Sequence, residues 1–169
     1  MWVPASRAFR SAAALPPRGP EPVPLASVGM LPEWPPGTVT ILSTQGDTPH
    51  AIPVSAVLRA GPQRVLLALG AGRTSLARLR ADPVVALVIL SADDVAVTAH
   101  GSARVLAEEL VDGVVAVEIA VERVQSHRRD AFVIDSGVGW RWTEPAAEER
   151  DGRVRAALAR LAAQAPPAY

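Results

Sequence analysis

Apolar and polar side chains alternate through the middle of the chain, which is the pattern of β-strands with one buried face. In the range 114–124, every second residue from Val115 to Val121 is apolar. Glu118 and Glu122 fall on the opposite face of the same segment, because successive side chains of a strand point to opposite sides. This range therefore predicts a half-buried strand.

Shorter runs rich in β-branched and aliphatic residues predict the other strands. These runs cover residues 38–44, 50–58, 64–69, 84–90, 95–106, 132–134 and 139–142. Pro53 cannot donate to a sheet hydrogen bond, so we expect a bulge or a sheet edge at that position. Gly101 lies inside a long run, where a glycine predicts a bend, a bulge or the close approach of another backbone.

A helical pattern appears directly after the third of these runs. Residues 74–81 place Leu76 and Leu79 on one face, three positions apart. Thr74 or Ser75 is the expected cap, since a hydroxyl side chain can accept a hydrogen bond from a free backbone N–H of the first turn. The segment therefore predicts a short helix that packs one side on the sheet.

The elements together predict a mainly β fold, a six-stranded antiparallel barrel with one short helix and a second helix at the end. Connections of a few residues favour antiparallel neighbours, because parallel strands need long crossovers. We expect a Pro-rich arm over residues 1–29, extended or partly disordered, since nine of the 16 prolines fall within the first 37 residues. The barrel domain then covers residues 30–145, and a C-terminal amphipathic helix covers residues 146–169.

Composition and charge exclude several classes of protein. Apolar residues make up 49% of the chain and charged residues 20%, which are globular proportions. Lys plus Arg number 17 and Asp plus Glu number 17, so the chain lacks the basic excess of a nucleic-acid binder. It also lacks a long apolar span and a secretory signal. We therefore expect a cytoplasmic protein that binds neither nucleic acid nor membrane.

The residue types that are missing restrict the chemistry further. There is no cysteine, which excludes disulfides, thiolate nucleophiles and cysteine-based metal sites. His50, His100 and His127 stand far apart, so no metal site is expected. Lysine is absent as well, so an anion site has to use arginine, backbone N–H groups or hydroxyls. No GxSxG motif is present, which disfavours hydrolase chemistry.

The segment from Gly70 to Pro83 carries the clearest chemical signal. A Gly-Ala-Gly turn opens the predicted helix, and Arg73, Thr74 and Ser75 occupy its first turn. A helix N-terminus offers free N–H groups and a positive dipole end, so these residues predict a phosphate-binding turn. The segment matches neither the Walker loop nor the GxGxxG fingerprint, and the alternative is an ordinary capped surface helix.

Two segments in order resemble the pyridoxamine 5′-phosphate oxidase-like, FMN-binding split-barrel superfamily. The segments are PHAIPVS at residues 49–55 and GRTSLARLRADPVVAL at residues 72–87. The resemblance covers roughly residues 30–143 and implies a six-stranded split barrel that forms a homodimer, with FMN in grooves between the subunits. It also implies the residues that bind this cofactor. The ring would be lined by Pro53, Val54 and Ser55, and the phosphate would be held by Arg73, Thr74 and Ser75.

The chain departs from the family pattern in the phosphate turn. Many members have a lysine at the position of Ser75 and an asparagine at the position of Arg78, and this chain has neither residue type. Arg73 could replace the missing charge; the alternatives are a deazaflavin, haem or no cofactor. Trp140 and Arg141 are further candidates for cofactor binding. In one interpretation they pack on the barrel, and in the other they reach the ligand groove of the partner subunit.

The function expected from these observations is FMN binding by a homodimer, in an oxidoreductase that acts on a small molecule. A bound flavin carries the redox chemistry itself, so the lack of a catalytic acid–base constellation fits this function. The alternatives are a non-catalytic flavin-, deazaflavin- or haem-binding protein, and a split-barrel dimer that has lost its cofactor.

Overall fold

The computed structural model describes residues 27–164. The strands are β1 (Ser27–Val28), β2 (Thr40–Thr44), β3 (His50–Val54), β4 (Val57–Gly61), β5 (Arg64–Gly70), β6 (Val84–Ser91), β7 (Val95–Val111) and β8 (Val114–Ser126). The helices are α1 (Thr74–Ala81) and α2 (Pro145–Ala163). Most of the arm predicted for residues 1–29 lies outside the described residues.

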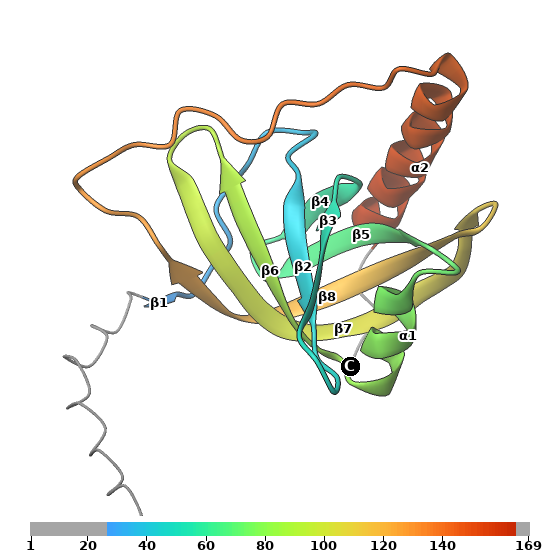
Figure 1. Cartoon of the computed structure of the whole chain (residues 1–169), viewed down its shortest axis with the longest axis horizontal. Helices are drawn as coiled ribbons and strands as arrows, with labels where there is room; N and C mark the ends of the chain where they lie inside the picture. The colour runs from blue at the N-terminus through green and yellow to red at the C-terminus, as the bar shows by residue number, and fades with distance from the viewer. Residues whose placement is uncertain (1–26, 165–169) are drawn as a thin grey trace, which may run out of the picture.

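The strands form one antiparallel sheet in the order β3-β2-β6-β7-β8-β5-β4, and β1 pairs with β8. Leu42 of β2 and Leu87 of β6 share one buried core with Leu67 of β5 and Ile119 of β8. Strands from distant parts of the order reach a common core only because the sheet curls, as Figure 1 shows. This arrangement confirms the predicted mainly β antiparallel barrel.

The strands number eight and not six, because the run 50–58 divides into β3 and β4 and because β1 adds a short strand before them. Val54 and Val57 are both buried, 5% and 7% exposed, although residues three apart on one strand would face opposite sides. The chain therefore bends at Ser55 and Ala56. After this bend β4 pairs with β5, whereas β3 pairs with β2.

The two longest strands, β7 and β8, join at a tight turn whose Gly113 has a φ of 68°. The bulge expected at Gly101 is present, since the pairing of β7 with β8 shifts register between His100 and Gly101. A Cβ atom on Gly101 would lie 2.0 Å from the carbonyl oxygen of Ala120. The close approach of the two backbones is thus the reason for a glycine here.

The prediction of strands at 132–134 and 139–142 is wrong. After β8 the chain runs in irregular structure past the β6–β7 turn to the start of α2 (Figure 1). Alternating apolar residues form a strand only beside a partner edge, and this segment pairs with no strand of the described chain. It is attached instead by two hydrogen bonds to Asp94. The Asp94 N–H donates to the carbonyl oxygen of Ile134, and the Ile134 N–H donates to the Asp94 carboxylate.

Both predicted helices are present. Helix α1 buries Leu76 and Leu79, as its spacing predicts, but its N-cap is Arg73. Neither Thr74 nor Ser75 caps it, and no side chain makes a cap hydrogen bond. Helix α2 packs its apolar face, around Leu158, on the outer side of β4, β5 and β7, where it forms a second apolar cluster.

Candidate functional site

A cavity of about 250 Å³ lies where the β3–β4 bend meets the turn before α1. It is lined by Ile52, Pro53, Val54, Ser55, Ala56, Ala68, Leu69, Gly70 and Arg73. Pro53, Val54 and Ser55 are close to Arg73 here because β4 folds back along β5, and the C-terminal end of β5 leads into the Gly70–Arg73 turn. Four of the residues expected to bind a cofactor thus line one cavity.

A second cavity, of about 310 Å³, continues from the first and shares five lining residues with it. The shared residues are Ala56, Ala68, Leu69, Gly70 and Arg73. Trp142, Arg150 and Asp151 are added from the C-terminal part of the chain. We call the two cavities together the groove.

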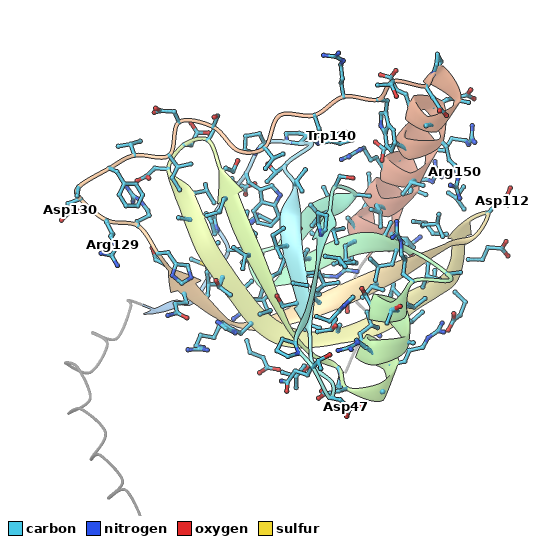
Figure 2. The ribbon with its side chains drawn as sticks, viewed as in Figure 1. Asp47, Asp112, Arg129, Asp130, Trp140 and Arg150 are labelled. Atoms are coloured by element: carbon cyan, nitrogen blue, oxygen red, sulfur yellow. The ribbon has the colours of Figure 1, made fainter. Side chains whose placement is uncertain are left out.

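Arg150 is the residue of the groove that sequence reasoning missed. It projects from α2 toward the β7–β8 turn, where its Nη2 donates to the carbonyl oxygen of Asp112 over 2.8 Å (Figure 2). That turn is also tied to the loop before α1, because the N–H of Ala71 donates to the carbonyl oxygen of Gly113. Two arginines, Arg73 and Arg150, therefore line the same cavity from different elements.

The beginning of α1 has the properties of an anion site. Arg73 is exposed, and within residues 27–164 no ion-pair partner of it is found. The N–H of Leu76 bonds to the Arg73 carbonyl oxygen, whereas the N–H groups of Thr74 and Ser75 have no partner within the helix and no side chain caps them. Free N–H groups beside a guanidinium attract an anion, and phosphate satisfies both at once.

Thr74 and Ser75 have different surroundings from Arg73. Ser75 is only 1% exposed, and its hydroxyl lies 2.9 Å from Nε2 of His50 on β3. Its side chain therefore joins α1 to the sheet and does not line the groove. Thr74 is exposed and lies outside the lining of both cavities.

Trp140 and Arg141 line a third, wide depression of about 840 Å³, which also includes Trp142. The Trp140 indole N–H donates to the carbonyl oxygen of Gly37 over 2.9 Å. Its ring meets Trp142 edge to face, with centroids 5.3 Å apart. These contacts hold Trp140 against its own chain, beside the groove, since Trp142 and Asp151 line both spaces.

Arg155 of α2 connects this depression to the β3–β4 bend. Its guanidinium lies 5.8 Å from the centre of the Trp140 ring and donates to the Ser55 carbonyl oxygen over 2.9 Å. It also pairs with Asp151 over 2.6 Å. The carboxylate neutralises the arginine, so this contact orders the site without adding net charge.

No group of three or more His, Asp and Glu side chains among the described residues could hold a metal ion. None of the helices in residues 27–164 combines the length and the hydropathy needed to cross a membrane.

Comparison with known proteins gives matches among solved structures only: no family model and no curated protein matches the chain. A candidate pyridoxamine 5′-phosphate oxidase from Listeria innocua is 18% identical, with a TM-score of 0.47 over 54% of this chain and 90% of that one. An FAD-binding protein from Mesorhizobium loti is 15% identical, with a TM-score of 0.44 over 53% and 87%. A heme-binding protein from Mycobacterium smegmatis is 17% identical, with a TM-score of 0.44 over 53% and 48%.

These identities and TM-scores describe a likeness in fold and assign no activity to this chain. Over about half of this chain, its fold is similar to those of the three proteins named above.

Proposed function

We propose that the chain binds FMN in the groove, with the ring against the β3–β4 bend and the phosphate at the start of α1. The observation that carries this proposal is the meeting of Pro53, Val54 and Ser55 with Arg73 in one cavity. An apolar wall next to a cationic turn suits a molecule that has a flat ring at one end and a phosphate at the other.

The residues present fit such a ligand in charge as well as shape. Arg73 and the uncapped N–H groups of α1 supply donors for the phosphate. Arg150 adds a second positive charge to the lining of the second cavity, which Arg73 also lines. This pair offsets the absence of lysine, because two guanidiniums can share the charge of one phosphate.

The activity that we propose is that of an oxidoreductase acting on a small molecule. When bound, a flavin supplies the electron transfer, so the protein has to bind, orient and shield it. Pro53 and Val54 would exclude water from one face of the ring, and Arg73 would fix the phosphate end. The heme-binding structural neighbour makes a haem-binding, non-catalytic role the alternative.

We also propose a homodimer, in which a second copy covers the outer face of β2, β3 and β6. These three strands contain no Asp, Glu or Arg. Ile41 on β2 is paired with Pro53 on β3 and with Val88 on β6. The next residue, Leu42, is buried in the core, so the side chains of Ile41, Pro53 and Val88 face outward. An uncharged apolar sheet face is typical of an obligate interface, for which we expect more than roughly 2,000 Å² of buried area.

Pro53 belongs both to this face and to the lining of the groove. A partner on the face would therefore stand at the mouth of the groove and help to enclose the ring.

The experiment that tests the function is an absorbance spectrum of the purified protein, followed by titration with FMN and with riboflavin. We expect a flavin spectrum and tighter binding of FMN than of riboflavin, because only FMN carries the phosphate. Reduction of the bound flavin by NADH or NADPH would support the oxidoreductase. A haem spectrum, or equal affinity for the two flavins, would contradict the proposal.

A further inference from the structure

Two tryptophans lie exposed next to each other beside the groove, which is uncommon for such large apolar side chains. Trp140 is 38% exposed and Trp142 is 40% exposed. Both line the wide depression described above, whose volume is about 840 Å³. The indole faces therefore provide apolar surface at which water is poorly held, and a flat ring could displace that water.

The tryptophan pair is held in place before any ligand arrives. Trp140 is fixed by its hydrogen bond to Gly37, by the edge-to-face contact with Trp142 and by Arg155 over its ring. A preordered aromatic surface binds with a smaller loss of side-chain entropy than a mobile one. Arg155 lies over one face of the Trp140 ring and the indole N–H is bonded to Gly37, so a ligand in the depression would contact the parts of the two rings that stay exposed.

The charges around the depression cancel, which favours an uncharged ligand. Asp151 and Arg155 are paired with each other. Arg141 and Glu148, which have opposite signs, are both exposed and line the same space. A charged ligand would thus find no excess of the opposite charge.

Three glycines line this depression and place no side chain in it. Gly37, Gly139 and Gly152 all line it, and a Cβ atom on any of them would meet no atom within 4 Å. Gly152 lies inside α2, where a glycine costs about 0.5–1 kcal/mol relative to alanine. The packing of the helix does not require a glycine at this position.

We infer that Trp140 and Trp142 bind a planar, uncharged ring compound, such as a quinone or another conjugated ring, as the second ligand of the protein. Its site is distinct from the groove but touches it, because Trp142 and Asp151 line both. That this ring compound acts together with a bound flavin rests on the proposed function. Its binding to Trp140 and Trp142 does not depend on that function.

The test uses the full-length protein and menadione, a flat uncharged naphthoquinone, as the probe. Menadione binding is measured by quenching of tryptophan fluorescence and by calorimetry, with and without saturating FMN. The main variant is Gly152→Phe, which fills the depression without removing a contact. Gly152→Ala controls for the loss of glycine, and Ala163→Phe places the same ring at an exposed position roughly three turns further along α2.

We expect the wild type to bind menadione in the presence of FMN. Gly152→Phe should weaken menadione binding about tenfold or more, because the blocked pair loses its ring contact. Gly152→Ala and Ala163→Phe should stay within about twofold of the wild type. FMN affinity should be the same in all four proteins.

Three results would overturn the inference: no menadione binding by the wild type, equal affinity in Gly152→Phe, or displacement of menadione by FMN. Menadione binding that Gly152→Phe abolishes, in a protein that binds no flavin, would support the ring site and contradict the proposed flavin function. The two proposals therefore fail separately.

Discussion

Arg73 is the residue on which phosphate recognition should depend most. A charge-assisted contact to an anion contributes about 1.5–3 kcal/mol, so Arg73→Ala should weaken FMN binding by about 10- to 150-fold. Riboflavin should bind both proteins almost equally, because it has no phosphate. Flavin fluorescence titration of both proteins with both ligands measures the difference.

Arg80 provides the matched control for this substitution. It lies on the same helix and is also exposed, but it pairs with Glu108. Arg80→Ala removes the same charge and should leave FMN affinity within about twofold, because the pair lies outside the groove lining. Equal affinity of wild type and Arg73→Ala for FMN would show that Arg73 is only a surface residue of α1.

Ser75 should affect folding more than binding. Its buried hydroxyl bonds to His50, so Ser75→Ala leaves an imidazole nitrogen without a partner and should cost about 1 kcal/mol or more of unfolding free energy. FMN affinity should change little. Urea unfolding measures the loss, and exposed Thr74→Ala, expected within about 0.5 kcal/mol, is the control. A large loss of FMN affinity in Ser75→Ala would place the hydroxyl in the phosphate site after all.

Among the strands, one buried carboxylate joins β5, β7 and β8 in addition to their backbone pairing. Glu118 on β8 is 1% exposed and receives hydrogen bonds from Arg64 on β5, at 2.6 Å, and from Arg104 on β7, at 2.6 and 2.9 Å. Burial alone would raise the pKa of Glu118. The hydrogen bonds and charges of Arg64 and Arg104 outweigh it and hold the pKa below the ordinary value of 4.5.

A lowered pKa gives a pH dependence of definite sign. The folded protein holds the Glu118 proton more weakly than the unfolded chain, so the carboxylate stabilises the fold above pH 4.5 and this contribution is lost as pH falls through the folded pKa. Glu118→Gln should lower the unfolding free energy by about 3 kcal/mol at pH 7, because the neutral amide removes the buried negative charge that pairs with Arg64 and Arg104.

The measurement is urea unfolding of wild type and Glu118→Gln at several pH values from 7 downward. The difference between the two proteins should shrink below pH 4.5. Glu122→Gln, an exposed carboxylate on the same strand, should change stability by less than about 0.5 kcal/mol at each pH. A difference that stays constant down to acid pH would exclude the ionised carboxylate as its source.

For the whole molecule, the outer face of β2, β3 and β6 predicts association. Ile41→Glu puts a charge at the centre of the uncharged face and should convert a dimer to a monomer, because an unpaired charge is costly to bury. Ile41 is 37% exposed in the protomer, so folding should be retained. Light scattering at micromolar concentration gives the mass, and Ala156→Glu on exposed α2 is the control. A monomeric wild type would contradict the dimer.

Local sequence predicted most of the elements of this fold. The alternation in 114–124 lies within β8, and the Leu76 and Leu79 spacing lies within α1. Of the C-terminal helix predicted for residues 146–169, the part up to Ala163 is α2, and residues 165–169 lie outside the described residues. Such patterns are reliable because burial of one face requires a fixed period of apolar residues. The bulge at Gly101 could be expected for a similar reason, since only glycine tolerates a backbone this close.

The alternation of apolar and polar residues does not show whether a segment pairs with a neighbouring strand or whether the chain bends within it. The run 50–58 keeps its apolar character through the bend at Ser55, and residues 132–142 alternate without any neighbouring edge. Pairing is decided by segments distant in sequence, so it is a property of the assembled sheet.

The same limit applies to the site. The turn chemistry of Arg73 is local, and its meeting with Pro53–Ser55 was implied by the family resemblance. Nothing in the sequence placed Arg150 in that cavity, turned Ser75 toward His50, or set the two tryptophans beside the groove. These contacts join elements far apart in the chain, and only the packing of α2 and α1 on the curled sheet brings their side chains within reach.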